Sequence, residues 1–63
     1  MRIQLIAEQV EGGTFYYIEK DGKYDIGSGS MNYEETEARY LTMVKNPKKL
    51  NEPMKTIVLD GTN

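Results

Sequence analysis

The segment Thr14-Phe15-Tyr16-Tyr17-Ile18-Glu19-Lys20-Asp21-Gly22-Lys23-Tyr24 decides the fold that we expect for this chain. Its first seven residues are rich in β-branched and aromatic side chains, which favour an extended strand. Asp-Gly then separates them from a second strand-like run at residues 23–26, and both turn residues tolerate the positive φ of a type I′ turn. The segment therefore predicts a β-hairpin with Asp21-Gly22 at its tip.

Two further strands and one helix complete the predicted fold. Residues 3–10 and 54–59 read as strands, one before and one after the hairpin. Asn32, with a glutamate three residues later, matches the capping box at the start of a helix. Pro47 ends that helix, because the residue before a proline is pushed out of the α region. We expect a helix of about 33–45 and the element order β-β-β-α-β.

The three strands of a meander leave the outer edge of the first strand free, and we place the last strand there. The expected architecture is one small α+β domain, residues 1–63, with a four-stranded sheet in the spatial order 4-1-2-3. The helix packs on one face of this sheet. Both directions, parallel and antiparallel to its neighbour, remain open for the last strand.

The loop at residues 11–13 determines which side chains share a face of the sheet. A three-residue loop with Gly13 in the left-handed conformation pairs Leu5 with Glu19. A two-residue Gly12-Gly13 turn is the less favourable alternative, because it places Glu8 beside a tyrosine. With the longer loop, the helix side of the sheet collects an apolar set: Ile3, Leu5, Ala7, Phe15, Tyr17, Tyr24 and Ile26. The helix covers this set with Tyr33, Tyr40 and Val44, flanked by Leu41 and Met43.

The same register leaves an apolar group, surrounded by charged residues, on the face that the helix does not cover. An apolar centre with a polar rim is typical of protein interfaces, and tyrosine is enriched at binding hot spots. Scattered apolar residues on a hydrated face are the alternative interpretation. We expect a partner interface at Ile6, Val10, Tyr16 and Ile18.

The composition narrows the classes of function. The chain has 63 residues, a formal net charge of −2, no cysteine and no histidine. A domain of this size has a marginal core and commonly needs disulfides, a metal or a partner subunit. Disulfides are excluded, and the commonest transition-metal ligand and general base is missing. We expect a non-enzymatic protein without metal or cofactor, stabilised as a homodimer through the uncovered face.

Two groups of charged residues give further candidate contacts. The acidic residues at the predicted helix start match the helix dipole, and they can also engage a basic groove on a partner: Glu34, Glu35 and Glu37. The basic cluster offers an alternative function, a small nucleic-acid or anion-binding domain: Lys45, Lys48, Lys49 and Lys55. The negative net charge disfavours nucleic acid, because neutralisation of phosphates supplies much of that affinity.

These features together predict a non-enzymatic protein-binding module, a small inhibitor or modulator that occupies the surface of another protein. A short, acidic, cofactor-free chain has the character of the accessory proteins of phages and other mobile elements, many of which block a host or defence enzyme. This expectation rests on size and character alone. The sequence has no signal-peptide pattern and no apolar run long enough to span a bilayer, so we expect a cytoplasmic location.

Overall fold

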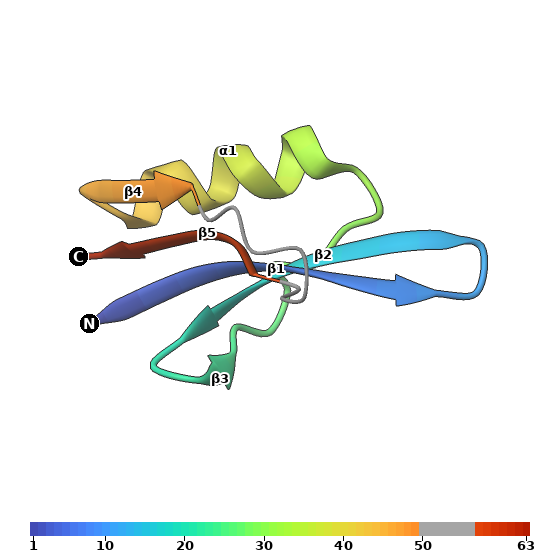
Figure 1. Cartoon of the computed structure of the whole chain (residues 1–63), viewed down its shortest axis with the longest axis horizontal. Helices are drawn as coiled ribbons and strands as arrows, with labels where there is room; N and C mark the ends of the chain where they lie inside the picture. Colours follow the sequence, from blue (N-terminus) through green and yellow to red (C-terminus); the bar gives the residue numbers. More distant parts are fainter. Residues whose placement is uncertain (50–56) are drawn as a thin grey trace.

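The computed structural model describes residues 1–49 and 57–63. Within these residues the fold is a five-stranded antiparallel sheet with one helix on one face (Figure 1). The elements are β1 (Arg2–Val10), β2 (Gly13–Lys20), β3 (Lys23–Tyr24), α1 (Tyr33–Met43), β4 (Asn46–Lys49) and β5 (Ile57–Thr62). The predicted α+β class is confirmed. The described part of the chain contains no helix long and apolar enough to cross a membrane.

The predicted four-stranded sheet in the order 4-1-2-3 is wrong, because the order is β3-β2-β1-β5-β4. The last strand does lie beside the first, with Leu59 opposite Leu5 in an antiparallel pair. The extra strand, β4, precedes it and pairs with its outer edge. All four residues of β4 are exposed, so the strand has no apolar alternation that reveals it in the sequence. Residues 54–56, the start of the predicted last strand, lie outside the described residues.

The loop between β1 and β2 has two residues, Glu11 and Gly12, and the predicted three-residue loop is wrong. Gly12 has a φ of 94°, a conformation that glycine adopts without steric cost. With this shorter loop, Leu5 pairs with Ile18 instead of Glu19. A shift of one residue in the pairing moves every side chain of β2 to the opposite face of the sheet.

The charge of Glu19 explains why the predicted register does not form. That register places Glu19 opposite Leu5 beneath the helix, where an unpaired buried carboxylate costs on the order of several kcal/mol. In the structure Glu19 is half-buried and pairs with Gln4 on the face away from α1. Ile18 takes the place beneath the helix, with 0% of its surface exposed.

The second hairpin forms as predicted at its turn but not along its length. Asp21 has a φ of 51° and Gly22 a φ of 81°, as a type I′ turn requires. Glu19 pairs with Tyr24, which confirms that part of the register. The predicted strand to Ile26 is wrong, since β3 ends at Tyr24 and Ile26 is 89% exposed.

Residues 25–30 follow β3 and line the outer edge of β2. Tyr16 and Ser30 exchange two backbone hydrogen bonds, each 2.8 Å long. The backbone N–H of Ile18 donates to the Ser28 hydroxyl at 3.0 Å. This loop therefore satisfies backbone groups that an unpaired edge strand would expose.

α1 begins where the sequence predicts and ends two residues early. The Asn32 side chain caps it by accepting a hydrogen bond of 3.2 Å from the backbone N–H of Glu35. Val44 ends the helix in an extended conformation and is buried. Lys45, which the prediction placed in the last helical turn, lies beyond the helix and leads into β4.

The core lies between α1 and the sheet and is centred on Tyr40. Its buried residues are Ile3, Leu5, Ile18, Tyr40, Val44 and Leu59. The Tyr40 hydroxyl donates a hydrogen bond of 3.1 Å to the Ile3 carbonyl, and burial raises the pKa of Tyr40 to about 12. A Cβ atom at Gly61 would lie 2.7 Å from this hydroxyl oxygen, so β5 passes the tyrosine only because position 61 has no side chain.

The register can be tested with two isoleucines that lie in opposite environments. Ile18→Ala should lower the free energy of unfolding by about 2–5 kcal/mol, and Ile18→Val by about 1 kcal/mol, because both remove packed core atoms. Ile26→Ala and Ile26→Val should change it by less than about 0.5 kcal/mol. Urea denaturation followed by circular dichroism measures all four. Equal effects at the two positions would contradict the register.

Candidate functional site

Three aromatic rings lie on the face of the sheet that α1 does not cover. Side chains alternate along a strand, so the burial of Tyr16 and Ile18 toward the helix sends Phe15 and Tyr17 to the other face. Tyr24 of β3 stands beside them. We call Phe15, Tyr17 and Tyr24 the aromatic strip. Tyr24 is 49% exposed and the other two rings are half-buried.

The rings of the aromatic strip contact one another in sequence, with Tyr17 in the middle. The ring centroids of Phe15 and Tyr17 are 6.0 Å apart, with an interplanar angle of 29°. Those of Tyr17 and Tyr24 are 5.5 Å apart at 76°, an edge-to-face arrangement. Both geometries lie in the favourable range for aromatic pairs. The strip is therefore a continuous surface that spans two strands.

Neighbouring residues hold the strip in place. Ile6 of β1 lies opposite Tyr17 and is only 6% exposed. The Phe15 ring rests against the backbone of Gly29, where a Cβ atom would overlap it. Gly29 belongs to the loop that lines β2, so this loop positions the ring as well as the strand edge.

Two carboxylates flank the aromatic strip. Glu8 of β1 pairs with Phe15, and Glu19 of β2 pairs with Tyr24. The pKa of Tyr17 is raised, first by burial and then by the negative charges of Glu19 and Glu8. Both charges therefore act on the centre of the strip.

Arg2, a cation on this face, is already paired with a carboxylate. Arg2 of β1 donates two hydrogen bonds to Asp60 of β5, at 3.0 Å from Nε and 2.8 Å from Nη2. This pairing holds the pKa of Asp60 below its usual value. The aromatic strip therefore lies in an environment that favours positive charge.

The structure does not bring the predicted interface residues to one surface. Ile18 lies in the core with Tyr40, and Tyr16 packs edge-to-face on Tyr33 of the helix, with ring centroids 5.2 Å apart. Both were predicted on the outer face, and the shifted register places them on the inner one. Ile6 remains on the outer face but is buried, and Val10 is 40% exposed at the end of β1.

The predicted acidic contact is located on the other layer, at the first turns of α1. Glu34 and Glu35 are exposed, and Glu35 forms an ion pair with Arg39 one turn later. Glu37 accepts a hydrogen bond of 2.7 Å from the Tyr33 hydroxyl. Two of these three glutamates thus already contact side chains of their own helix. Their contact with a partner stays a prediction.

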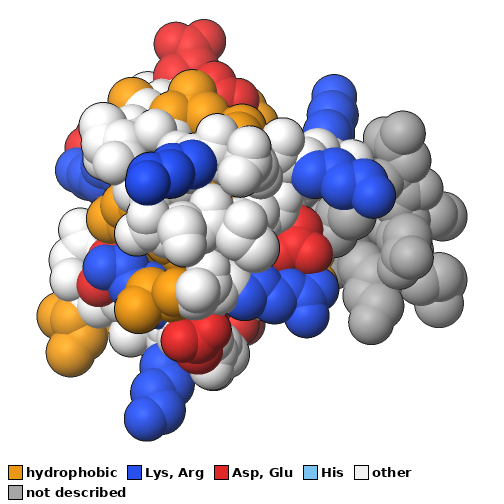
Figure 2. All heavy atoms as spheres, turned by 90° about the vertical axis from the view of Figure 1, so that its left-hand side faces the viewer, with side chains coloured by type: hydrophobic (Ala, Val, Ile, Leu, Met, Phe, Trp, Pro, Cys, Tyr) orange, Lys and Arg blue, Asp and Glu red, His pale blue; other side chains and the backbone are white. Residues whose placement is uncertain are grey.

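The predicted basic cluster is divided among different surfaces. Lys48 lies opposite Asp60, while the next residue, Lys49, points to the other face of the sheet. Lys45 lines a cavity, and Lys55 lies outside the described residues. Figure 2 shows basic side chains scattered over the end of the molecule that carries both termini, with acidic and uncharged atoms between them.

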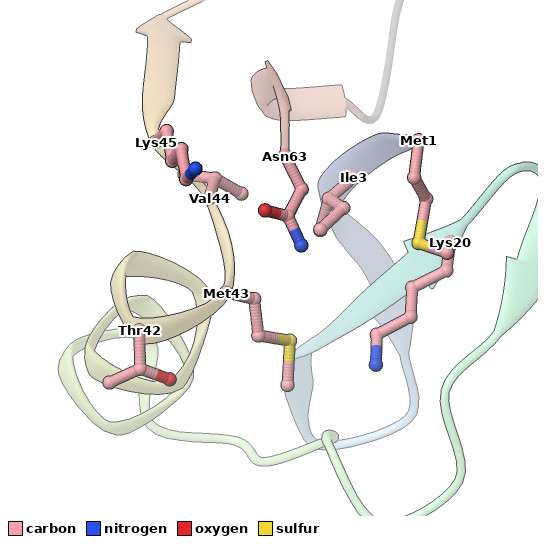
Figure 3. Close-up of a pocket in the computed structure, with 8 residues that line it drawn as sticks. All are labelled: Met1, Ile3, Lys20, Thr42, Met43, Val44, Lys45 and Asn63. Atoms are coloured by element: carbon pink, nitrogen blue, oxygen red, sulfur yellow. The ribbon is translucent and has the colours of Figure 1, made fainter.

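That cavity has a volume of about 350 Å³ and lies where the end of α1 meets the two chain termini (Figure 3). The side chains of Lys20, Met43 and Asn63 converge on it. The Lys20 ammonium lies 3.8 Å from the Asp25 carboxylate, so one of the two lysines that line the cavity already has a charged partner. Among the described residues, the lining mixes apolar and cationic groups and has no carboxylate side chain that could act as a general base.

Comparison with protein-family models, curated proteins and solved structures found no match for the chain. Among residues 1–49 and 57–63, no three acidic side chains gather closely enough to hold a metal ion. We therefore choose the aromatic strip as the candidate site because of the arrangement of its three rings. Sequence reasoning missed it because the wrong register placed all three rings beneath the helix.

The contact that positions the strip can be tested at Gly29. Gly29→Ala should lower the free energy of unfolding by about 1–3 kcal/mol, because the added methyl group overlaps the Phe15 ring. In a Phe15→Ala background the same substitution should cost less than about 0.5 kcal/mol, because the ring is gone. A double-mutant cycle by urea denaturation measures the difference. An unchanged cost in both backgrounds would show that the ring does not rest on Gly29.

Proposed function

We propose that this chain is a non-enzymatic protein-binding module that docks on a partner protein through the aromatic strip and acts by occupying the partner's surface. The observation that carries the proposal is the position of three contacting rings on the sheet face opposite α1. Tyrosine supplies large contact area with few rotatable bonds and is enriched at binding hot spots. The surrounding carboxylates give the strip a polar rim.

A partner protein suits this surface better than a second copy of the chain. A two-fold dimer through the strip would use the same surface patch on both copies. The interface would then contain Glu8 and Glu19 from both copies, and these four like charges oppose association. A different protein with basic groups at its surface meets no such repulsion.

Nucleic acid is the second candidate, and one feature favours it. Aromatic side chains on a sheet can stack single-stranded bases, and the observed register places three of them on the face opposite α1. The two carboxylates beside the rings repel phosphate, however, and Lys48 and Lys49 of the predicted basic cluster lie on opposite faces of the sheet. These charges favour a protein partner.

The proposal can be tested with two exposed apolar residues on opposite layers, Tyr24 at 49% and Leu41 at 50% exposure. A photo-reactive p-benzoylphenylalanine at position 24, in the cells that naturally produce the chain, should cross-link one partner protein. The same group at position 41 should not. With that partner purified, Tyr24→Ser should weaken binding at least tenfold in a titration, and Leu41→Ser less than twofold.

Three results would contradict the proposal. Cross-linking of the partner from position 41 alone would move the interface to α1. Cross-linking from position 24 to a second copy of the chain, together with a dimer in sedimentation, would show that the strip forms a homodimer and does not bind a different protein. Binding of single-stranded nucleic acid that Tyr24→Ser abolishes would favour the second candidate.

A further inference from the structure

We propose that the aromatic strip recognises a cationic side chain, arginine in preference to lysine, that projects from the partner protein. The cation lies over the ring of Tyr17, between the carboxylates of Glu8 and Glu19. This inference rests on the proposed function and adds the chemistry of the partner.

The ring geometry provides a face for a cation. Tyr17 and Tyr24 meet at 76°, so the two ring planes form a corner with Tyr17 on one side. A guanidinium or ammonium group over a tyrosine face is attracted by the negative charge of the ring's π electrons. Phe15 stacks on Tyr17 at an interplanar angle of 29°, so it supports the Tyr17 ring beside this corner.

The carboxylates add the second attraction. Glu19 is two residues from Tyr17 on β2, and Glu8 is the diagonal neighbour of Tyr17 on β1, since Ile6 lies directly opposite. Diagonal neighbours in an antiparallel pair are roughly 7–8 Å apart, within reach of a long side chain. Both charges already raise the pKa of Tyr17. A cation above this ring therefore interacts with the ring and with both carboxylates.

The cationic side chains of β1, β2 and β3 do not occupy the position over the Tyr17 ring. Arg2 is bonded to Asp60, and the register directs Lys20 and Lys23 to the opposite face, where Lys20 approaches Asp25. Among the described residues, neither Glu8 nor Glu19 forms an ion pair. The strip therefore has two negative charges available to a partner.

Arginine matches this corner better than lysine does. The guanidinium group is planar and stacks on a ring while its N–H groups still point sideways toward carboxylates. An ammonium group is compact and strongly hydrated, so it gives up more water to lie against an aromatic surface. We therefore expect the order arginine, lysine, then a neutral analogue.

The test uses three capped peptides that differ only in one side-chain type, acetyl-(Gly-Arg)₃-amide, acetyl-(Gly-Lys)₃-amide and acetyl-(Gly-citrulline)₃-amide. Citrulline has nearly the shape of arginine without its charge. Titration of the whole chain, followed by the proton NMR signals of the strip rings, should show saturable shifts with arginine and weaker binding with lysine. The citrulline peptide should produce no shifts.

Variants separate the ring from the charge. Tyr17→Phe keeps the aromatic face and should bind the arginine peptide within twofold of the original chain. Tyr17→Leu keeps apolar area but not the face, and should weaken binding about two- to fivefold. Glu19→Gln should weaken it by a similar factor. Glu34→Gln examines the rival acidic surface on α1 and should leave the affinity unchanged.

Equal binding of the arginine and citrulline peptides, or equal binding by Tyr17→Phe and Tyr17→Leu, would overturn this inference. A larger effect of Glu34→Gln than of Glu19→Gln would move the cation site to the helix and would overturn it as well. These failures leave the proposed function intact if position 24 still cross-links the partner. Loss of that cross-link, with normal arginine binding, would instead defeat the proposed function.

Discussion

The burial of Tyr40 and Ile18 in one core cluster between α1 and the sheet is the constraint on which the rest of the structure depends. Both side chains are completely buried. The Tyr40 hydroxyl donates a hydrogen bond to the Ile3 carbonyl, so this buried polar group is not left without a partner. Side chains alternate along β2, so placing Ile18 inside places Tyr17 outside. The composition of the uncovered face is thus a direct consequence of the core.

Local signals in the sequence were sufficient for the elements that local interactions define. Asn32 caps the helix, and Asp21-Gly22 makes the turn, because each depends on a few neighbouring residues. The register of β1 and β2 depends on a loop with two adjacent glycines, where loops of two and three residues are both sterically possible. The charge of Glu19 was the deciding signal, since one register places it opposite Leu5 beneath the helix and the other leaves it half-buried on the opposite face. β4 could not be predicted, because its strand conformation comes from pairing with β5 and its sequence has no apolar alternation.

The same register error accounts for what was wrong about the candidate site. The predicted register places Tyr16 and Ile18 on the outer face, whereas the observed register places Phe15 and Tyr17 there. The outer face still carries apolar and tyrosine side chains, but from different residues. The described edges of the sheet also have features that disfavour strand addition. β4 carries Pro47 and two lysines, which disfavour edge-to-edge pairing, and residues 25–30 line β2. The proposed function uses the side chains of the sheet face away from α1, where the aromatic strip and its carboxylates lie.

The central claim is that Ile18 lies in the core with Tyr40 while Tyr17 lies on the far side of the sheet. A nuclear Overhauser spectrum of the isotopically labelled chain tests it most directly. The structure predicts cross-peaks between the Ile18 methyl groups and the Tyr40 ring, and between the rings of Tyr17 and Tyr24. Cross-peaks from the Tyr17 ring to the Tyr40 ring, without any from Ile18, would contradict the register and the aromatic strip together.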